Sequence, residues 1–184
     1  MTEHATSEPL LLDRAEEEPF PLAATDAVVL AVHDAARAAH CYRATLGMRC
    51  TAYAGPETGS PHLRSYVLES GPARYVLSSA LRPVGAARRI ARHLAEHGEG
   101  LLEVCLSVPD AYGAYDYAVD RGATSVAEPY ELADRHGTVV MAVIGTAGPV
   151  RHTLVDRTGY RGAYLPGYVR PPAHLLPPVR SLFG

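Results

Sequence analysis

Short apolar runs punctuated by glycine and proline alternate along the chain with segments of helical periodicity. Residues 28–32 form a strongly apolar run that is typical of a buried strand. Asp34 follows in the position of a helix N-cap, and Gly47 stands where such a helix would end. The pattern predicts a helix between these two residues. Its expected buried face consists of Ala35, Ala39, Tyr42 and Leu46.

The second half of the chain repeats this order. Residues 104–108 are again an apolar run, Asp110 is again a good N-cap, and Gly122 again stands at the expected end of the helix. The cap and the glycine are separated by nearly the same distance in both halves, which indicates an internal repeat. The expected buried face of the second helix consists of Ala111, Ala114, Tyr115 and Ala118.

Strand-like segments follow each helix, at 50–54, 65–69 and 75–80 and again at 125–132, 138–145 and 152–156. Each half therefore has the pattern βαβββ, and a helix at about 86–97 joins the halves. The predicted fold class is α+β, with two tandem βαβββ modules (about 26–81 and 101–157) in a half-open barrel. This order resembles the vicinal oxygen chelate (glyoxalase-like) superfamily.

The ends of the chain differ from this middle part. Residues 1–21 are polar, acidic and contain proline, so we expect a disordered tail. Residues 22–169 are expected to form the glyoxalase-like domain. Residues 170–184 carry two Pro-Pro pairs and are expected to be a stiff linker.

Composition excludes several classes of function. The net charge is −3 and all 17 basic residues are arginine, so lysine-dependent chemistry is excluded. No basic cluster indicates nucleic acid, and no apolar run reaches membrane-span length. Cys41, Cys50 and Cys105 have no CxxC spacing, which favours reduced thiols and a cytoplasmic location.

One sequence pattern suggests a zinc protease. His93, Glu96 and His97 match the HxxEH pattern, in which two histidines one helical turn apart share a metal. Arginines at 88, 89 and 92 surround the pattern. They favour a solvated helix end instead.

A second metal candidate lies on the predicted strands. Glu103 shares a strand face with Cys105, and His152 and Asp156 lie on another strand. One imidazole and two carboxylates suit a hard divalent ion. The alternative is a polar strand face turned to solvent or buried water, which the lack of a second convergent histidine favours. We therefore predict no catalytic or cofactor-binding residues, with Glu103, His152 and Asp156 as the metal candidates.

The most specific stretches are His-Thr-Leu-Val-Asp-Arg-Thr-Gly-Tyr at 152–160 and Tyr-Leu-Pro-Gly-Tyr at 164–168. Together with Ala-Glu-Pro-Tyr at 127–130, they resemble the N-terminal half of the 4-hydroxyphenylpyruvate dioxygenase family and of its sister family, 4-hydroxymandelate synthase. The resemblance covers about residues 20–170. These residues do not distinguish descent from a dioxygenase from descent from a synthase.

The resemblance implies two such domains in the full-length family, with Fe(II) and the 2-oxo acid held by the C-terminal domain through two histidines and a glutamate. The corresponding positions here are Ala27, Glu103, and Thr153 or Leu154. They cannot replace the triad, so no cofactor is expected in this chain, although Fe(II) is implied for the full-length family. The chain ends where that family enters its C-terminal domain.

The leading hypothesis is a non-iron-binding half of such an enzyme, inactive alone, in a family that converts 4-hydroxyphenylpyruvate to homogentisate in tyrosine catabolism. Its expected partners are a C-terminal catalytic domain or partner chain and further copies of itself, without nucleic acid or membrane. Three alternatives remain open: half of a 4-hydroxymandelate synthase, a metalloenzyme using Glu103, His152 and Asp156, and a free-standing binder of a small aromatic molecule. Tyr66, Tyr75 and Tyr130 are candidate lining residues of that binder, and packing in the core is the favoured alternative for each.

Overall fold

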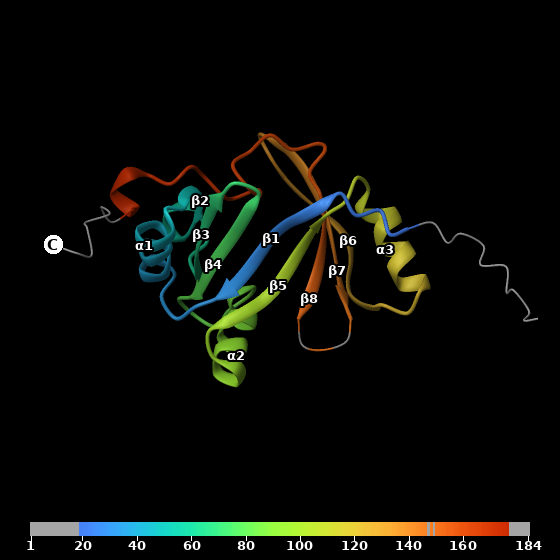
Figure 1. Ribbon diagram of the computed structural model, residues 1–184, viewed down its shortest axis with the longest axis horizontal. Helices are drawn as coiled ribbons and strands as arrows, with labels where there is room; N and C mark the ends of the chain where they lie inside the picture. Colours follow the sequence, from blue (N-terminus) through green and yellow to red (C-terminus); the bar gives the residue numbers. More distant parts are fainter. Residues whose placement is uncertain (1–18, 147, 149, 177–184) are drawn as a thin grey trace, which may run out of the picture.

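One mixed sheet organises the protein, whose computed structural model describes residues 19–146, 148 and 150–176. Within these residues, eight strands follow the order β2-β3-β4-β1-β5-β8-β7-β6. At the centre, β1 (Ala24–Ala31) and β5 (Gly100–Ser107) are antiparallel. Each central strand pairs in parallel with the last strand of its own half, β4 (Ala73–Ala80) or β8 (Arg151–Asp156). The two halves therefore join along one shared ladder (Figure 1).

Hairpin partners complete each half of the sheet. They are β2 (Arg49–Ala54) and β3 (Leu63–Ser70) in the first half, and β6 (Thr124–Asp134) and β7 (Gly137–Gly145) in the second. The sheet curves into a cup, but its edges β2 and β6 do not pair with each other (Figure 1). This confirms the predicted α+β fold of two βαβββ modules in a barrel that stays half open.

Two helices cover the outside of the cup, and the connecting helix covers one end of it. The first helix, α1 (Ala35–Leu46), packs on β3 and β4, and α3 (Ala111–Asp120) packs on β7. The connecting helix, α2 (Ala87–His97), contacts β4 and β5. Short 3-10 turns lie at Pro56–Thr58 and Ala173–Leu175.

Both predicted helix caps are present. The Asp34 carboxylate accepts hydrogen bonds from the backbone N–H groups of Ala36 (2.9 Å) and Arg37 (3.1 Å), and Asp110 accepts one from Tyr112. Gly47 takes the left-handed conformation, with φ 64°, that ends α1. The local pattern therefore specified both helix starts correctly.

One predicted buried position is wrong. Leu46 is 62% exposed, because it is the last residue of α1, where the chain turns through Gly47 toward β2. Ala35 and Ala39 are buried as predicted, and Tyr42 packs edge-on against Tyr75, with ring centroids 5.9 Å apart.

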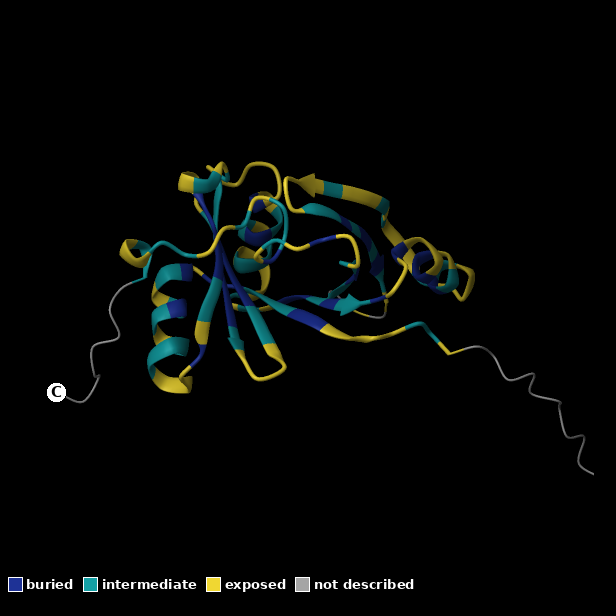
Figure 2. Ribbon diagram, turned by 90° about the horizontal axis from the view of Figure 1, so that it is seen from above, coloured by how far each residue is buried: buried dark blue, intermediate teal, exposed yellow. Residues whose placement is uncertain are grey.

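The core has three main parts, and Figure 2 shows the buried residues concentrated on the strands. One part lies between α1 and β3–β4, around Tyr53, Leu68 and Leu77. A second lies beneath α3, around Leu154 and Ile144. The third lines the inside of the cup, and this third part surrounds the candidate site. None of the described helices has the length and apolar character to cross a membrane.

The described parts of both terminal segments contact the domain. Phe20 packs edge-on against Tyr117 of α3, at 5.7 Å between ring centroids. Leu175 and Leu176 pack against the core beneath α1. Most of the predicted tail (1–18) and the end of the predicted linker (177–184) lie outside the described residues.

Candidate functional site

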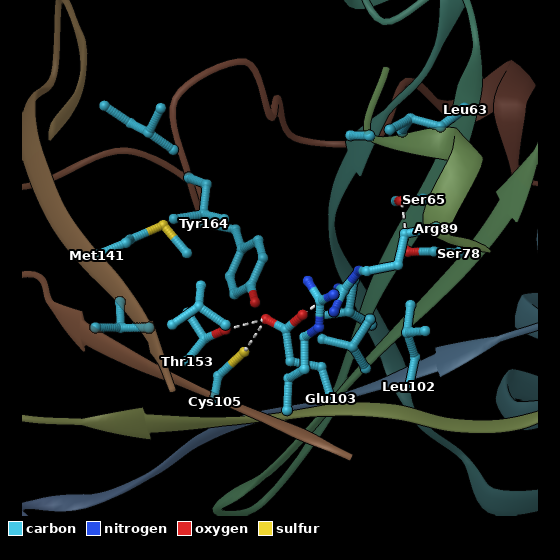
Figure 3. Close-up of a pocket in the computed structure, with 18 of the residues that line it drawn as sticks. Leu63, Ser65, Ser78, Arg89, Leu102, Glu103, Cys105, Met141, Thr153 and Tyr164 are labelled. Carbon is cyan, nitrogen blue, oxygen red and sulfur yellow. Dashed lines mark hydrogen bonds and ion pairs between the residues drawn. The ribbon is translucent and has the colours of Figure 1, made fainter. Parts of the chain in front are cut away.

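The inner face of the sheet surrounds a cavity of about 580 Å³. Both halves of the chain contribute to its wall, and most of the lining is apolar. Several of the polar lining residues surround Glu103, at the middle of the cup (Figure 3). Those nearest Glu103 are Arg89, Cys105 and Thr153, and the lining also includes Ser65, Ser78, Arg151 and Arg157.

Glu103 is 8% exposed, and its carboxylate is bound by residues from three elements. Arg89 of α2 forms an ion pair with one oxygen, and the Thr153 hydroxyl of β8 donates a hydrogen bond to the other. The Cys105 thiol donates to that second oxygen at 3.6 Å. Burial, followed by the neighbouring Glu103 charge, raises the pKa of Cys105 well above its usual value. Cys105 is therefore a neutral thiol rather than a nucleophilic thiolate.

A second polar cluster lies near the start of β1, around Asp26. Arg157 donates to both Asp26 oxygens, each at 2.7 Å, and Arg74 donates to one of them at 3.1 Å. The ladder between β1 and β5 has a bulge between Thr25 and Ala27, which takes Asp26 out of the regular pairing.

Residues 157–169 form a strap across the cup. At its start, Arg157 donates to the Tyr164 carbonyl, and its guanidinium lies 4.6 Å from the centroid of the Tyr164 ring. At its end, Val169 and Tyr53 of β2 exchange backbone hydrogen bonds of 2.8 and 2.9 Å. The strap thus connects the end of β8 to the opposite edge of the sheet. It supplies Tyr164 and Tyr168, whose ring centroids lie 5.0 Å apart, to the cavity wall.

The structure does not bring the three metal candidates together. Glu103 faces the cavity, but His152 pairs in register with Val104 and its Nδ1 lies 3.4 Å from the Thr146 hydroxyl. Successive strand residues point to opposite faces, so His152 lies on the other side of the sheet. Asp156 accepts hydrogen bonds from Thr158 in the turn after β8.

Nor do the positions that correspond to the family's iron ligands fit a facial triad. Ala27 has no ligand atom in its side chain, Glu103 is engaged by Arg89, and the Thr153 hydroxyl donates to Glu103. Across residues 19–146, 148 and 150–176, no three His, Cys, Asp or Glu side chains gather as a metal site. The residues present therefore do not fit Fe(II) in the 2-His-1-carboxylate arrangement.

The HxxEH pattern lies at the C-terminal end of α2 and lines a second cavity of about 210 Å³. The rings of His93 and His97 are 5.1 Å apart, and His97 lies 3.8 Å from Glu96. Three arginines line the same cavity, namely Arg89, Arg92 and Arg151. These cations oppose the binding of a metal cation.

Of the three tyrosines considered as lining residues, one lines the main cavity, and the other two pack in the core, as the favoured alternative predicted. Tyr130 is part of the wall. Tyr66 and Tyr75 lie instead in the core beneath α1, with Tyr66 against Tyr53 at 5.0 Å between ring centroids. Their strand positions place them on the outer face of the sheet. Tyr164 and Tyr168 were not predicted, because their position depends on the path of the strap.

A family model described as the Glyoxalase/Bleomycin resistance protein/Dioxygenase superfamily matches residues 24–158. The chain belongs to this superfamily. The matched residues span both modules and the whole sheet, so the family assignment and the architecture agree.

Among curated proteins, the chain is similar to 4-hydroxyphenylpyruvate dioxygenases. It is 38% identical over 170 residues to that of Pyricularia oryzae, covering 84% of this chain and 41% of the relative. It is 40% identical over 139 residues to that of Yarrowia lipolytica, covering 75% of this chain and 35% of the relative. The chain therefore spans about two fifths of the length of these relatives.

Two solved structures show the same fold. A mutant of 4-hydroxymandelate synthase from Streptomyces coelicolor superposes with a TM-score of 0.71 at 29% identity, covering 83% of this chain and 43% of that one. A methylmalonyl-CoA epimerase from the same organism gives 0.60 at 20% identity, covering 73% and 97%. The epimerase likeness concerns the fold alone.

Proposed function

We propose that this chain is the N-terminal, non-iron-binding half of a 4-hydroxyphenylpyruvate dioxygenase-like enzyme. It is inactive alone, and it contributes structure and contact surface to a catalytic C-terminal domain or partner chain and to a homo-oligomer. Its similarity to dioxygenases over about two fifths of their length supports this role. The same similarity would suit half of a 4-hydroxymandelate synthase. The free thiols of Cys41, Cys50 and Cys105 suit a cytoplasmic location.

The observation that carries the proposal is the chemistry of the side chains at the three positions that correspond to the iron ligands of the full-length family. Ala27 and Thr153 supply no strong iron ligand, and the one carboxylate, Glu103, is buried in contact with Arg89 and Thr153. Arg89 binds one carboxylate oxygen and Thr153 donates to the other, so the charge and both oxygens already have partners. Releasing the carboxylate for a metal would leave Arg89 without its ion pair.

The test is oxygen uptake by the purified chain with Fe(II), ascorbate and 4-hydroxyphenylpyruvate. We expect no uptake above the protein-free rate, while a full-length relative is active in the same assay. Cooperative thermal unfolding of the chain, followed by circular dichroism, must first show that it is folded. Enzymatic uptake by this chain that disappears in Glu103→Gln would overturn the proposal.

The cavity of about 580 Å³ supports a second candidate, a free-standing binder of a small molecule. Its size lies within the usual range for ligand sites, and its wall is mostly apolar with a few polar groups. A ligand-dependent rise in Tm that persists with a metal chelator would favour this candidate. No rise with any aromatic compound tested would remove it.

A further inference from the structure

The smaller cavity, of about 210 Å³, is lined almost entirely by charged side chains and imidazoles. Leu102 is the apolar member of its lining. Residues three and four positions apart lie on the same side of a helix, so one side of α2 is turned toward this cavity. Helix α2 contributes Arg89, Arg92, His93, Glu96 and His97.

Arg151 lines the same cavity from the sheet. It pairs in register with Glu103 across the parallel ladder of β5 and β8, and Glu103 forms its ion pair with Arg89 of α2. The helix and the two strands therefore meet beside Arg151. The guanidinium groups of Arg92 and Arg151 thus reach one cavity from two different elements, the first from α2 and the second from β8.

The charge of these two guanidinium groups is not compensated. Among the described residues, no carboxylate lies within ion-pair distance of Arg92 or Arg151. The acid in the lining, Glu96, lies 3.8 Å from His97, and its side chain is 57% exposed, so water and salt screen its charge. The smaller cavity therefore has a surplus of positive charge.

Two groups in the lining respond to this surplus. Burial, and then the charges of Arg89 and Arg92, lower the pKa of Arg151. Burial, then His97 and Arg89, lower the pKa of His93. An anion between these side chains would relieve the repulsion that they exert on one another.

We propose that the smaller cavity binds a phosphate group, either as inorganic phosphate or as part of a small phosphate monoester. Two uncompensated guanidinium groups match the charge of nearly −2 that a phosphate group carries, and arginine N–H donors suit its oxygens. A phosphate offers oxygens in several directions, so it can accept from Arg92 and Arg151 together, and the imidazoles of His93 and His97 add further donors. This inference concerns the smaller cavity alone and does not depend on the proposed function.

The test is isothermal titration calorimetry of the folded chain with inorganic phosphate, and with acetate as a planar, monovalent comparison, at one fixed ionic strength. We expect phosphate to bind about tenfold more tightly than acetate, which is the effect of one further hydrogen bond to a charged group. Arg92→Gln and Arg151→Gln should each weaken phosphate binding about tenfold for the same reason. Arg88→Gln is the matched control, because it removes an equal charge from the same helix although exposed Arg88 lines neither cavity.

Methyl phosphate distinguishes the two sources of the phosphate group. Binding as tight as that of inorganic phosphate would assign the site to monoesters, and much weaker binding would assign it to free phosphate; both results support the site. A bound phosphate should also raise the pKa of the His93 imidazole, because a nearby anion favours its charged form. Proton NMR of the histidine rings, with and without phosphate, measures this shift.

Arg92→Gln keeps the test decisive if Arg151→Gln fails to fold, because Arg92 is exposed and Arg151 is half-buried. Weaker phosphate binding in Arg92→Gln with unchanged binding in Arg88→Gln supports the proposal. No phosphate binding, or equal binding of phosphate and acetate, would overturn it. An equal loss in Arg88→Gln would also overturn it, since the attraction would then come from the general charge of the helix. None of these results affects the oxygen-uptake test of the half-enzyme role.

Discussion

Removal of the Asp26 carboxylate tests how the strap is held to the sheet. Asp26 has a side chain that is only 4% exposed and that accepts three hydrogen bonds, two from Arg157 and one from Arg74. Asp26→Ala would leave the Arg157 guanidinium, 20% exposed, without its counterion. Breaking a buried ion pair from one side costs about 3–5 kcal/mol. Because Arg157 keeps some contact with solvent, we expect about 3 kcal/mol.

The assay is urea denaturation followed by circular dichroism, with the free energy of unfolding obtained by linear extrapolation. A double-mutant cycle with Arg157→Met should show that the two changes together cost less than their sum by about 1–3 kcal/mol. Glu69→Ala is the matched control, because Glu69 binds the same Arg74 from a more exposed position. Its expected cost is about 0–1 kcal/mol. Equal costs for Asp26→Ala and Glu69→Ala would refute the assignment of the strap's attachment to Asp26.

Two further predictions concern the core and the alkaline limit of stability. Leu77→Ala should lower the free energy of unfolding by about 2–5 kcal/mol, because Leu77 is fully buried. Leu46→Ala should change that free energy little, because Leu46 is 62% exposed. Similar losses for both variants in urea denaturation would contradict the described core. Burial and then the Glu57 hydrogen bond raise the pKa of Tyr53 to about 12, and burial raises that of Cys50 to about 11. Both groups therefore contribute stability that is complete below their unfolded pKa values and is lost as pH rises toward 12, so stability should fall above about pH 9. Tyr53→Phe should flatten this fall in urea titrations between pH 8 and about 12, and an unchanged slope would contradict it.

The elements with local signals were predictable from the sequence. Asp34 and Gly47 mark the ends of α1 because a side-chain acceptor and a left-handed residue are both local requirements. The alternation along β5 also placed Glu103 and Cys105 correctly on one face. These features depend on neighbours within a few positions along the chain.

The partners of those residues were not predictable in this way. Arg89 was interpreted as part of a solvated helix end, but it is half-buried and forms the ion pair with Glu103. Tyr164 and Tyr168 line the cavity because Arg157 and Val169 attach the strap to β1 and β2. Such contacts arise when distant segments close on one another, and no local period encodes them.

The most direct test of the half-enzyme account is anaerobic titration of the folded chain with Fe(II), followed by calorimetry. Because Ala27 and Thr153 supply no strong ligand and Glu103 is bound to Arg89, the account predicts no saturable binding. The control is Arg89→Gln, which frees the carboxylate without adding a histidine and should leave the result unchanged. Stoichiometric Fe(II) binding by the unaltered chain that is abolished in Glu103→Gln would contradict the account.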